Sequence, residues 1–160
     1  MGRSPGFTNA PGFDLITMPR VAQFTRDGNH AAIGFNGPSG RLVSTRAGAL
    51  VCEFTSPDAT EIGTVAIHSS TDSTGAERIE IAANSGRNWI YFWDGQCNPL
   101  GRQEVDAPLD YPANREIASL KYSPDGRQIG IIKADGLYLI PRNTPSESPA
   151  KSLDSHREDE

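Results

Sequence analysis

The feature that most constrains the fold is an internal repeat. When the Asp-Gly pairs at positions 27 and 125 are superposed, residues 21–35 align with residues 119–133, and a third copy occupies residues 64–93. The candidate third strands of the copies begin at positions 41, 89 and 137, which gives two steps of 48 residues. Because a fixed period means that one supersecondary unit recurs, the sequence predicts three stacked copies of a single unit.

The last copy shows most clearly what the unit is. Residues 117–122 (IASLKY) alternate between apolar and polar positions, and the turn sequence Ser-Pro-Asp-Gly follows them. Residues 128–133 (QIGIIK) and 137–140 (LYLI) are two more strand-like runs, separated by a second tight turn. Both of these runs are apolar on both faces, as in a sheet that is covered on both sides. The unit is therefore predicted to be an antiparallel meander.

Fourth strands are predicted at residues 49–55 (ALVCEFT) and, more weakly, at 100–105 (LGRQEV). Four antiparallel strands in about 48 residues are typical of a β-propeller blade. We expect an all-β chain with three four-stranded antiparallel propeller blades, a partial or half β-propeller, at about 21–55, 62–105 and 115–141. An all-β sandwich is disfavoured, because its strands are not expected to recur in register at a fixed period.

Two short motifs resemble those of WD40 repeats. Residues 92–95 (FWDG) resemble the end of a WD40 third strand with its Trp-Asp pair, and residues 122–130 (YSPDGRQIG) are similar to the turn between the first two strands of WD40 and TolB-type repeats. No Gly-His pair precedes any copy, and Ser44-Thr45 and Ile140-Pro141 stand near the Trp-Asp position of the other two copies. The resemblance thus implies degenerate WD40-like blades, with TolB-like repeats as the close alternative.

Three blades are too few to close a ring, because propellers have about four to eight blades. The third blade also lacks a fourth strand, since residues 141–152 are rich in Pro, Ser and charged residues. Within the N-terminal segment 1–20, residues 14–18 (DLITM) are a candidate closing strand for the third blade of the same chain or of a partner. Three interpretations remain open: a homodimer that closes a six-blade ring, a ring completed by a different protein, and a fragment of a larger propeller.

Composition and charge exclude several classes of function. The net charge is −5, and residues 143–160, with five acidic and two basic side chains, contribute −3 and leave −2 for the rest. A nearly neutral body argues against nucleic acid as a partner, which requires clustered basic residues. Residues 143–160 contain one large aliphatic residue, Leu153, and are predicted to be a disordered acidic tail.

The sequence contains no run of about 18 apolar residues and no apolar region of a signal peptide. We therefore expect no membrane partner and a cytoplasmic localisation, with the nucleus not excluded. In such a compartment Cys52 and Cys97 are expected to be reduced thiols that pack as small apolar residues.

Catalytic and metal-binding patterns are weak. Histidines occur at positions 30, 68 and 156, without the spacing of a metal site. His68 precedes Ser69, Ser70 and Asp72, but neighbours on one strand and its loop rarely converge as a catalytic triad does. The sequence therefore predicts no catalytic residues, no metal and no cofactor.

The aromatic run at residues 89–93 (WIYFW) is the remaining candidate for a binding site. Trp89, Tyr91 and Trp93 share one face of their strand, where packing between blades is favoured over stacking on a ligand. Trp93 and Asp94 at the strand end, with Arg87 in the preceding loop, are the candidate partner-binding rim. We expect a non-catalytic protein-interaction scaffold. The alternatives are a propeller module derived from a hydrolase whose catalytic part is elsewhere and a glycan- or small-ligand-binding propeller, which requires Trp89 or Trp93 to be exposed.

Overall fold

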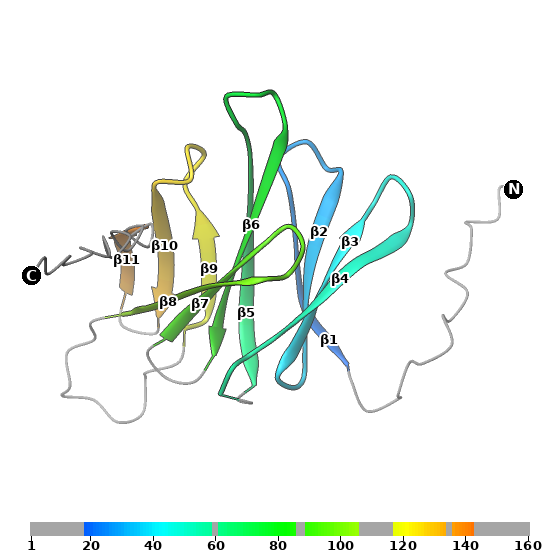
Figure 1. Ribbon diagram of the computed structural model, residues 1–160. Coiled ribbons are helices and arrows are strands. Elements are labelled where there is room, and N and C mark those ends of the chain that lie inside the picture. Colours follow the sequence, from blue (N-terminus) through cyan, green and yellow to red (C-terminus); the bar gives the residue numbers. More distant parts are fainter. Residues whose placement is uncertain (1–17, 59–60, 86–88, 106–116, 134–135, 143–160) are drawn as a thin grey trace, which may run out of the picture.

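The computed structural model describes residues 18–58, 61–85, 89–105, 117–133 and 136–142. These residues form eleven strands in three antiparallel sheets and no helix (Figure 1). Blade 1 consists of β1 (Pro19–Phe24), β2 (His30–Phe35), β3 (Ser39–Ser44) and β4 (Ala49–Thr55). Blade 2 consists of β5 (Ile62–Thr71), β6 (Glu77–Ser85), β7 (Trp89–Asp94) and β8 (Pro99–Glu104). Blade 3 consists of β9 (Ser119–Tyr122), β10 (Gln128–Lys133) and β11 (Gly136–Pro141).

The predicted all-β class and the partial propeller are confirmed. Each sheet is a meander, in the orders β1-β2-β3-β4, β5-β6-β7-β8 and β9-β10-β11. The weakly predicted fourth strand of blade 2 is present as β8, and the part of blade 3 that the structure describes has three strands.

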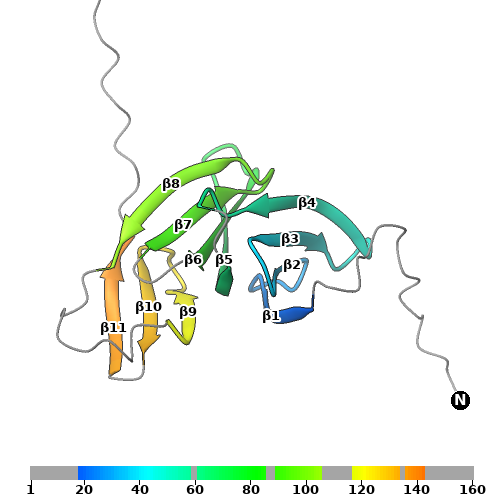
Figure 2. The same cartoon turned by 90° about the horizontal axis from the view of Figure 1, so that it is seen from below.

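The three sheets are arranged as an arc. Seen from below, they fan out with the first strands β1, β5 and β9 toward a common inner side and with β4, β8 and β11 on the outside (Figure 2). Blade 2 lies between blades 1 and 3, since β5 contacts β1 and β2 on one side and β9 on the other. Each terminal blade consequently has one face turned away from blade 2.

Blade 2 contributes to two separate cores, because successive side chains of a strand point to opposite faces. Along β7, Tyr91 and Trp93 belong to the core shared with blade 1, whereas Ile90 and Phe92 belong to the core shared with blade 3. All four side chains are buried. The prediction that the aromatic residues pack between blades is confirmed for Tyr91 and Trp93.

One detail of the repeat is corrected by the strand register. Leu42 pairs with Ala32 in blade 1, and Leu139 pairs with Gly130 in blade 3, so Leu42 corresponds to Leu139. The alignment of position 41 with 137 was wrong by one residue, because it placed side chains from opposite faces in equivalent positions. The observed third strands begin at 39, 89 and 136.

Two predicted segments lie outside the described residues. These are the C-terminal tail, 143–160, and all of the candidate closing strand except Met18. The Met18 carbonyl accepts a hydrogen bond from the Asn36 backbone N–H (2.9 Å), which places Met18 in blade 1. The closing-strand hypothesis stays a prediction.

Candidate functional site

The blade 1 end face is the side of that sheet turned away from blade 2. It contains residues that alternate with the core positions Val21, Ala32 and Leu42. Its members include the apolar residues Ala22, Phe24, Ala31, Ile33, Val43 and Leu50 and the Arg41–Glu53 ion pair. Phe24 is 63% exposed and Leu50 is 57% exposed, so large apolar side chains meet solvent on this face.

The blade 3 end face is the corresponding side at the other end of the arc. It comprises Lys121, Gly130, Ile132, Leu137 and Leu139, which alternate with the positions buried against blade 2. Ile132 pairs with Leu137, and Gly130 pairs with Leu139. Ile132 is 49% exposed and the two leucines are 68% and 65% exposed, which makes this a second unpartnered apolar surface.

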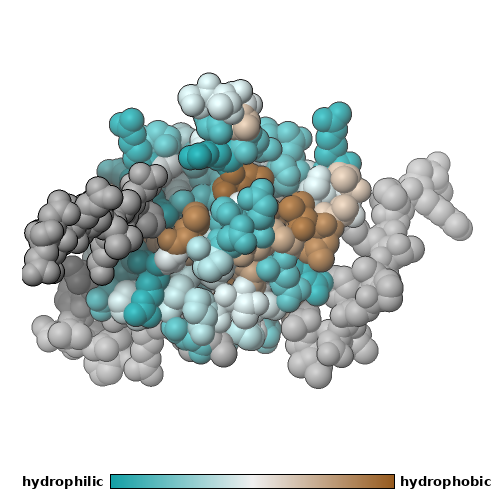
Figure 3. All heavy atoms as spheres, in the orientation of Figure 1, coloured by the Kyte–Doolittle hydropathy of each residue, from teal (hydrophilic) through white to brown (hydrophobic). Residues whose placement is uncertain are grey.

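The outer circumference of the arc has a different character. Figure 3 shows only small, separate hydrophobic patches among hydrophilic residues on the side that carries β4 and β8. Leu100 on β8 is 36% exposed, less than the exposed side chains of either end face. The end faces are therefore the stronger candidate interaction surfaces.

Blades 1 and 3 have the same turn between their first two strands. In blade 1, Thr25 Oγ1 donates to Asp27 (2.6 Å) and accepts from the His30 backbone N–H (3.0 Å). In blade 3, Ser123 Oγ makes the same two bonds, to Asp125 (2.6 Å) and from Gln128 (3.0 Å). The residue-by-residue equivalence of the two blades in this region therefore rests on geometry as well as on sequence.

These hydrogen bonds also stabilise the ionised form of the two aspartates. The side-chain bond from Thr25, followed by the backbone bond from Asn29, lowers the pKa of Asp27. The bonds from Ser123 and the Arg127 backbone lower the pKa of Asp125 in the same way. Each carboxylate therefore stabilises the turn in which it lies.

The equivalence shows that each end face corresponds to a face that is buried elsewhere in the chain. Phe24 is equivalent to Tyr122, which is 9% exposed and packs in the core between blades 2 and 3. At the other end, Leu139 is equivalent to Leu42, which is 0% exposed in the core between blades 1 and 2. Both end faces therefore have the residue pattern of a blade-to-blade contact.

Of the three residues of the predicted rim, the structure describes Trp93 and Asp94. Trp93 is 2% exposed and its ring packs 4.9 Å from that of Phe54. Asp94 is half-buried, and Arg87 lies outside the described residues. The structure thus places Trp93 in the core, while a role of Asp94 and Arg87 in binding a partner stays a prediction.

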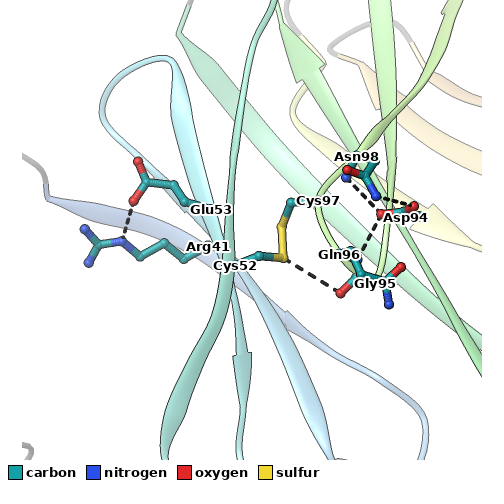
Figure 4. The surroundings of a disulfide bond; sticks show 8 residues. All are labelled: Arg41, Cys52, Glu53, Asp94, Gly95, Gln96, Cys97 and Asn98. Atoms are coloured by element: carbon teal, nitrogen blue, oxygen red, sulfur yellow. Dashed lines mark hydrogen bonds and ion pairs between the residues drawn. A yellow bond between two sulfur atoms is a disulfide. The ribbon is translucent and has the colours of Figure 1, made fainter.

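Asp94 organises the turn between β7 and β8. Its carboxylate accepts hydrogen bonds from the backbone N–H groups of Gln96 (2.9 Å) and Asn98 (2.8 Å). Burial works to raise the pKa of Asp94, but the hydrogen bonds from Asn98 and Gln96 outweigh it and hold the pKa below its usual value. The turn places Cys97 beside blade 1 (Figure 4).

Cys52 and Cys97 form a disulfide between blades 1 and 2 (Figure 4). The prediction of two reduced thiols was wrong, because the packing of β4 against the β7–β8 turn brings the two Cα atoms within 5.9 Å, a normal separation for a disulfide. The two residues are 45 positions apart, close to one repeat period, and this spacing was the signal available in the sequence.

The boundary between blades 2 and 3 is held by a polar cluster that sequence reasoning missed. Arg142, just after β11, donates to both Glu80 carboxylate oxygens (2.7 and 3.0 Å), and its guanidinium lies 3.6 Å from the centre of the Phe92 ring. Tyr122 Oη donates to the same carboxylate (2.6 Å). Burial, followed by the charge of Glu80, raises the pKa of Tyr122 well above its usual value.

His68 and Asp72 lie in different surroundings. The His68 ring packs 5.5 Å from the Tyr122 ring and against Gly126, where an added Cβ would lie 2.5 Å from His68 Nε2. The Asp72 carboxylate accepts from the backbone N–H groups of Thr74 (2.8 Å) and Ala76 (3.1 Å) in its own loop. Among the described residues, no three His, Cys, Asp or Glu side chains gather as a metal site would require, and no helix is long and apolar enough to cross a membrane.

Comparison with solved structures finds 444 matching chains. A chain from the crystal structure of the mitotic checkpoint complex matches with a TM-score of 0.59 and 14% identity, over 84% of this chain and 40% of that one. Raptor from Chaetomium thermophilum matches with a TM-score of 0.56 and 16% identity, over 79% of this chain and 11% of that one.

Both proteins contain WD40 propellers, and at these identities the likeness concerns the fold alone. The present chain spans less than half the length of either. No protein-family model and no curated protein matches the sequence.

Proposed function

We propose that the chain is a protein-interaction scaffold of WD40-like blades, whose two end faces pack against blades of a protein partner. The observation that carries the proposal is the pair of exposed apolar end faces, each equivalent in sequence and register to a face that is buried between blades of the same chain. A sheet face of this kind gains free energy when a second sheet covers it, at about 25 cal/mol per Å² of apolar surface.

Glycan or small-ligand binding has less support. That alternative requires an exposed tryptophan, but Trp93 is buried, and the Arg102 guanidinium lies 4.0 Å from the centre of the Trp89 ring. For the alternative of a propeller module derived from a hydrolase, the neighbouring coding sequence is the deciding observation, because a hydrolase domain there would favour it.

The compartment is a separate proposal. A cytoplasmic location is predicted from the absence of an apolar signal region, and reduced thiols were expected to follow from it, whereas disulfides persist mainly in oxidising compartments. We propose that the Cys52–Cys97 bond is present in the protein as it accumulates in its own cell. Thiol alkylation of freshly lysed cells, followed by mass spectrometry, would show it as two unmodified cysteines; two alkylated cysteines would favour the cytoplasm.

Photo-crosslinking tests the scaffold function. A benzophenone side chain is introduced into the full chain at position 24 or 139, with position 100 on the circumference as the control. The scaffold proposal predicts polypeptide adducts from positions 24 and 139, mapped by mass spectrometry to strand residues of the partner, and few from position 100. Absence of polypeptide adducts at both end faces above the level of the control would overturn it.

A further inference from the structure

We propose that the partner at both end faces is a second copy of this chain, bound head-to-tail so that the blade 1 end face of each copy packs on the blade 3 end face of the other. This inference rests on the proposed function, since it names the occupant of the same two surfaces. The product is a two-fold symmetric ring of six blades, within the range of about four to eight blades that propellers use.

The first argument is that the two end faces are opposite halves of one kind of interface. We call the side of a blade that points toward the next blade in the sequence its forward face, and the opposite side its rear face. Within the chain, each contact joins the forward face of one blade to the rear face of the next. The blade 3 end face is a forward face, equivalent to the blade 1 side that packs on blade 2. The blade 1 end face is a rear face, equivalent to the blade 3 side that packs on blade 2. A second copy therefore supplies the missing half at each end.

The second argument concerns the chemistry of the contact. The Tyr122 hydroxyl donates a hydrogen bond to Glu80 in the preceding blade, blade 2. The equivalent residue of blade 1, Phe24, has no hydroxyl, and the blade 3 end face that would receive it presents Ile132 and Leu139 and, among its described residues, no carboxylate. The apolar side chain is thus matched with an apolar surface.

The third argument is closure. A head-to-tail contact between two different faces either closes into a ring or continues into a filament. Because β1, β5 and β9 all lie toward one inner side of the arc, added copies curve around that side and favour a closed ring (Figure 2). In the two-copy ring both copies have both end faces covered.

The test is the solution mass of the full chain, measured by light scattering after size-exclusion chromatography. The proposal predicts a particle of twice 17.2 kDa. Phe24→Asp and Leu139→Asp should each shift the particle to the monomer mass, because a desolvated carboxylate would face an apolar surface in both contacts of the ring. Leu100→Asp, an equivalent change on the circumference, should leave the dimer intact.

A double variant distinguishes head-to-tail pairing from other dimers. In Phe24→Lys/Leu139→Asp, every head-to-tail contact would join a lysine to an aspartate, so the dimer should return at low salt and weaken as salt is added. A dimer that joined two blade 1 faces would bring the two lysines together and would not return. Circular dichroism and the absence of free thiols report folding of each variant.

The outcomes separate this inference from the function on which it rests. A folded monomer at all concentrations, or a dimer that both single variants leave intact, overturns the second copy as the occupant. If such a monomer still gives adducts to another polypeptide at positions 24 and 139, the scaffold function stands with a different partner. Loss of those adducts as well overturns both.

Discussion

The two boundaries inside the arc join equivalent faces of successive blades, but different chemistry holds them. Between blades 1 and 2 the apolar core, with the Phe54 and Trp93 rings 4.9 Å apart, is supplemented by one disulfide and by an exposed Arg20–Glu61 ion pair. Between blades 2 and 3 the apolar core is supplemented by the Arg142–Glu80 ion pair. The repeat thus determines the backbone of each blade and which side chains point to which face. The covalent or ionic contacts that hold two blades together differ from one pair of blades to the next.

The largest expected effect comes from removing one β7 side chain from each of the two cores in turn. Trp93→Ala and Phe92→Ala should each destabilise the chain by about 3–5 kcal/mol, because each leaves a cavity in a buried aromatic position. Denaturant unfolding measures the loss. Hydrogen exchange should then show lowered protection in blade 1 for Trp93→Ala and in blade 3 for Phe92→Ala. Lowered protection in the same blade for both variants would contradict the presence of two cores.

Removing the disulfide should affect only the first boundary. The Cys52→Ser/Cys97→Ser variant is expected to lose about 2–4 kcal/mol of unfolding free energy, since the bond restricts the unfolded chain. A reducing agent should produce the same loss in the wild type and none in the variant. Equal stability of the wild type with and without the reducing agent would show that the bond does not restrict the unfolded chain.

Breaking the ion pair should loosen the second boundary by a smaller amount. Arg142→Ala is expected to cost about 1–3 kcal/mol, because the half-buried Glu80 carboxylate loses two hydrogen bonds from a charged partner. Arg142→Lys retains the charge without the two parallel donors and should lie between the alanine variant and the wild type. An alanine variant as stable as the wild type would show that the ion pair does not stabilise the contact between blades 2 and 3.

The smallest effect is a dependence on alkaline pH. Because the folded state raises the pKa of Tyr122, first through burial and then through Glu80, the stability it contributes is complete below the unfolded value of about 10 and is lost as the pH rises above it. The unfolding free energy should therefore fall as the pH rises above about 10. Tyr122→Phe should reduce that fall.

Tyr91 provides the matched test at the first boundary, since burial, followed by its hydrogen bond to Asp58, also raises its pKa. The fall should be reduced less by Tyr91→Phe than by Tyr122→Phe, because Tyr122 has the more strongly raised pKa. The reverse order would place the stronger pH dependence at the first boundary.

The fold was largely predictable because its signals are local. Alternation, the Asp-Gly turns and the 48-residue spacing each act within a few strands, and the observed strands agree with them. The exact equivalence of the third strands was not predictable, because one residue in the β2–β3 loop changes which face Arg41 and Leu42 occupy. That choice depends on which side chains the next blade buries.

The contacts between blades were less predictable than the blades themselves. Nothing near Arg142 in the sequence points to Glu80, which lies 62 positions away, and the pair forms only because blade 3 packs against blade 2. The disulfide likewise depends on how two blades meet. The end faces followed from the repeat only when the register had shown which positions are equivalent.

The alternating membership of β7 in two cores limits how this chain can change by insertion and deletion. A one-residue indel within the strand would exchange Tyr91 and Trp93 with Ile90 and Phe92, so both cores would receive the wrong side chains at once. The loops accept a change of length, since the β2–β3 loop (36–38) is one residue longer than the β10–β11 loop (134–135). The lengths of the central strands of blade 2 are therefore fixed by the two cores. Changes in chain length are expected in the loops that connect the strands.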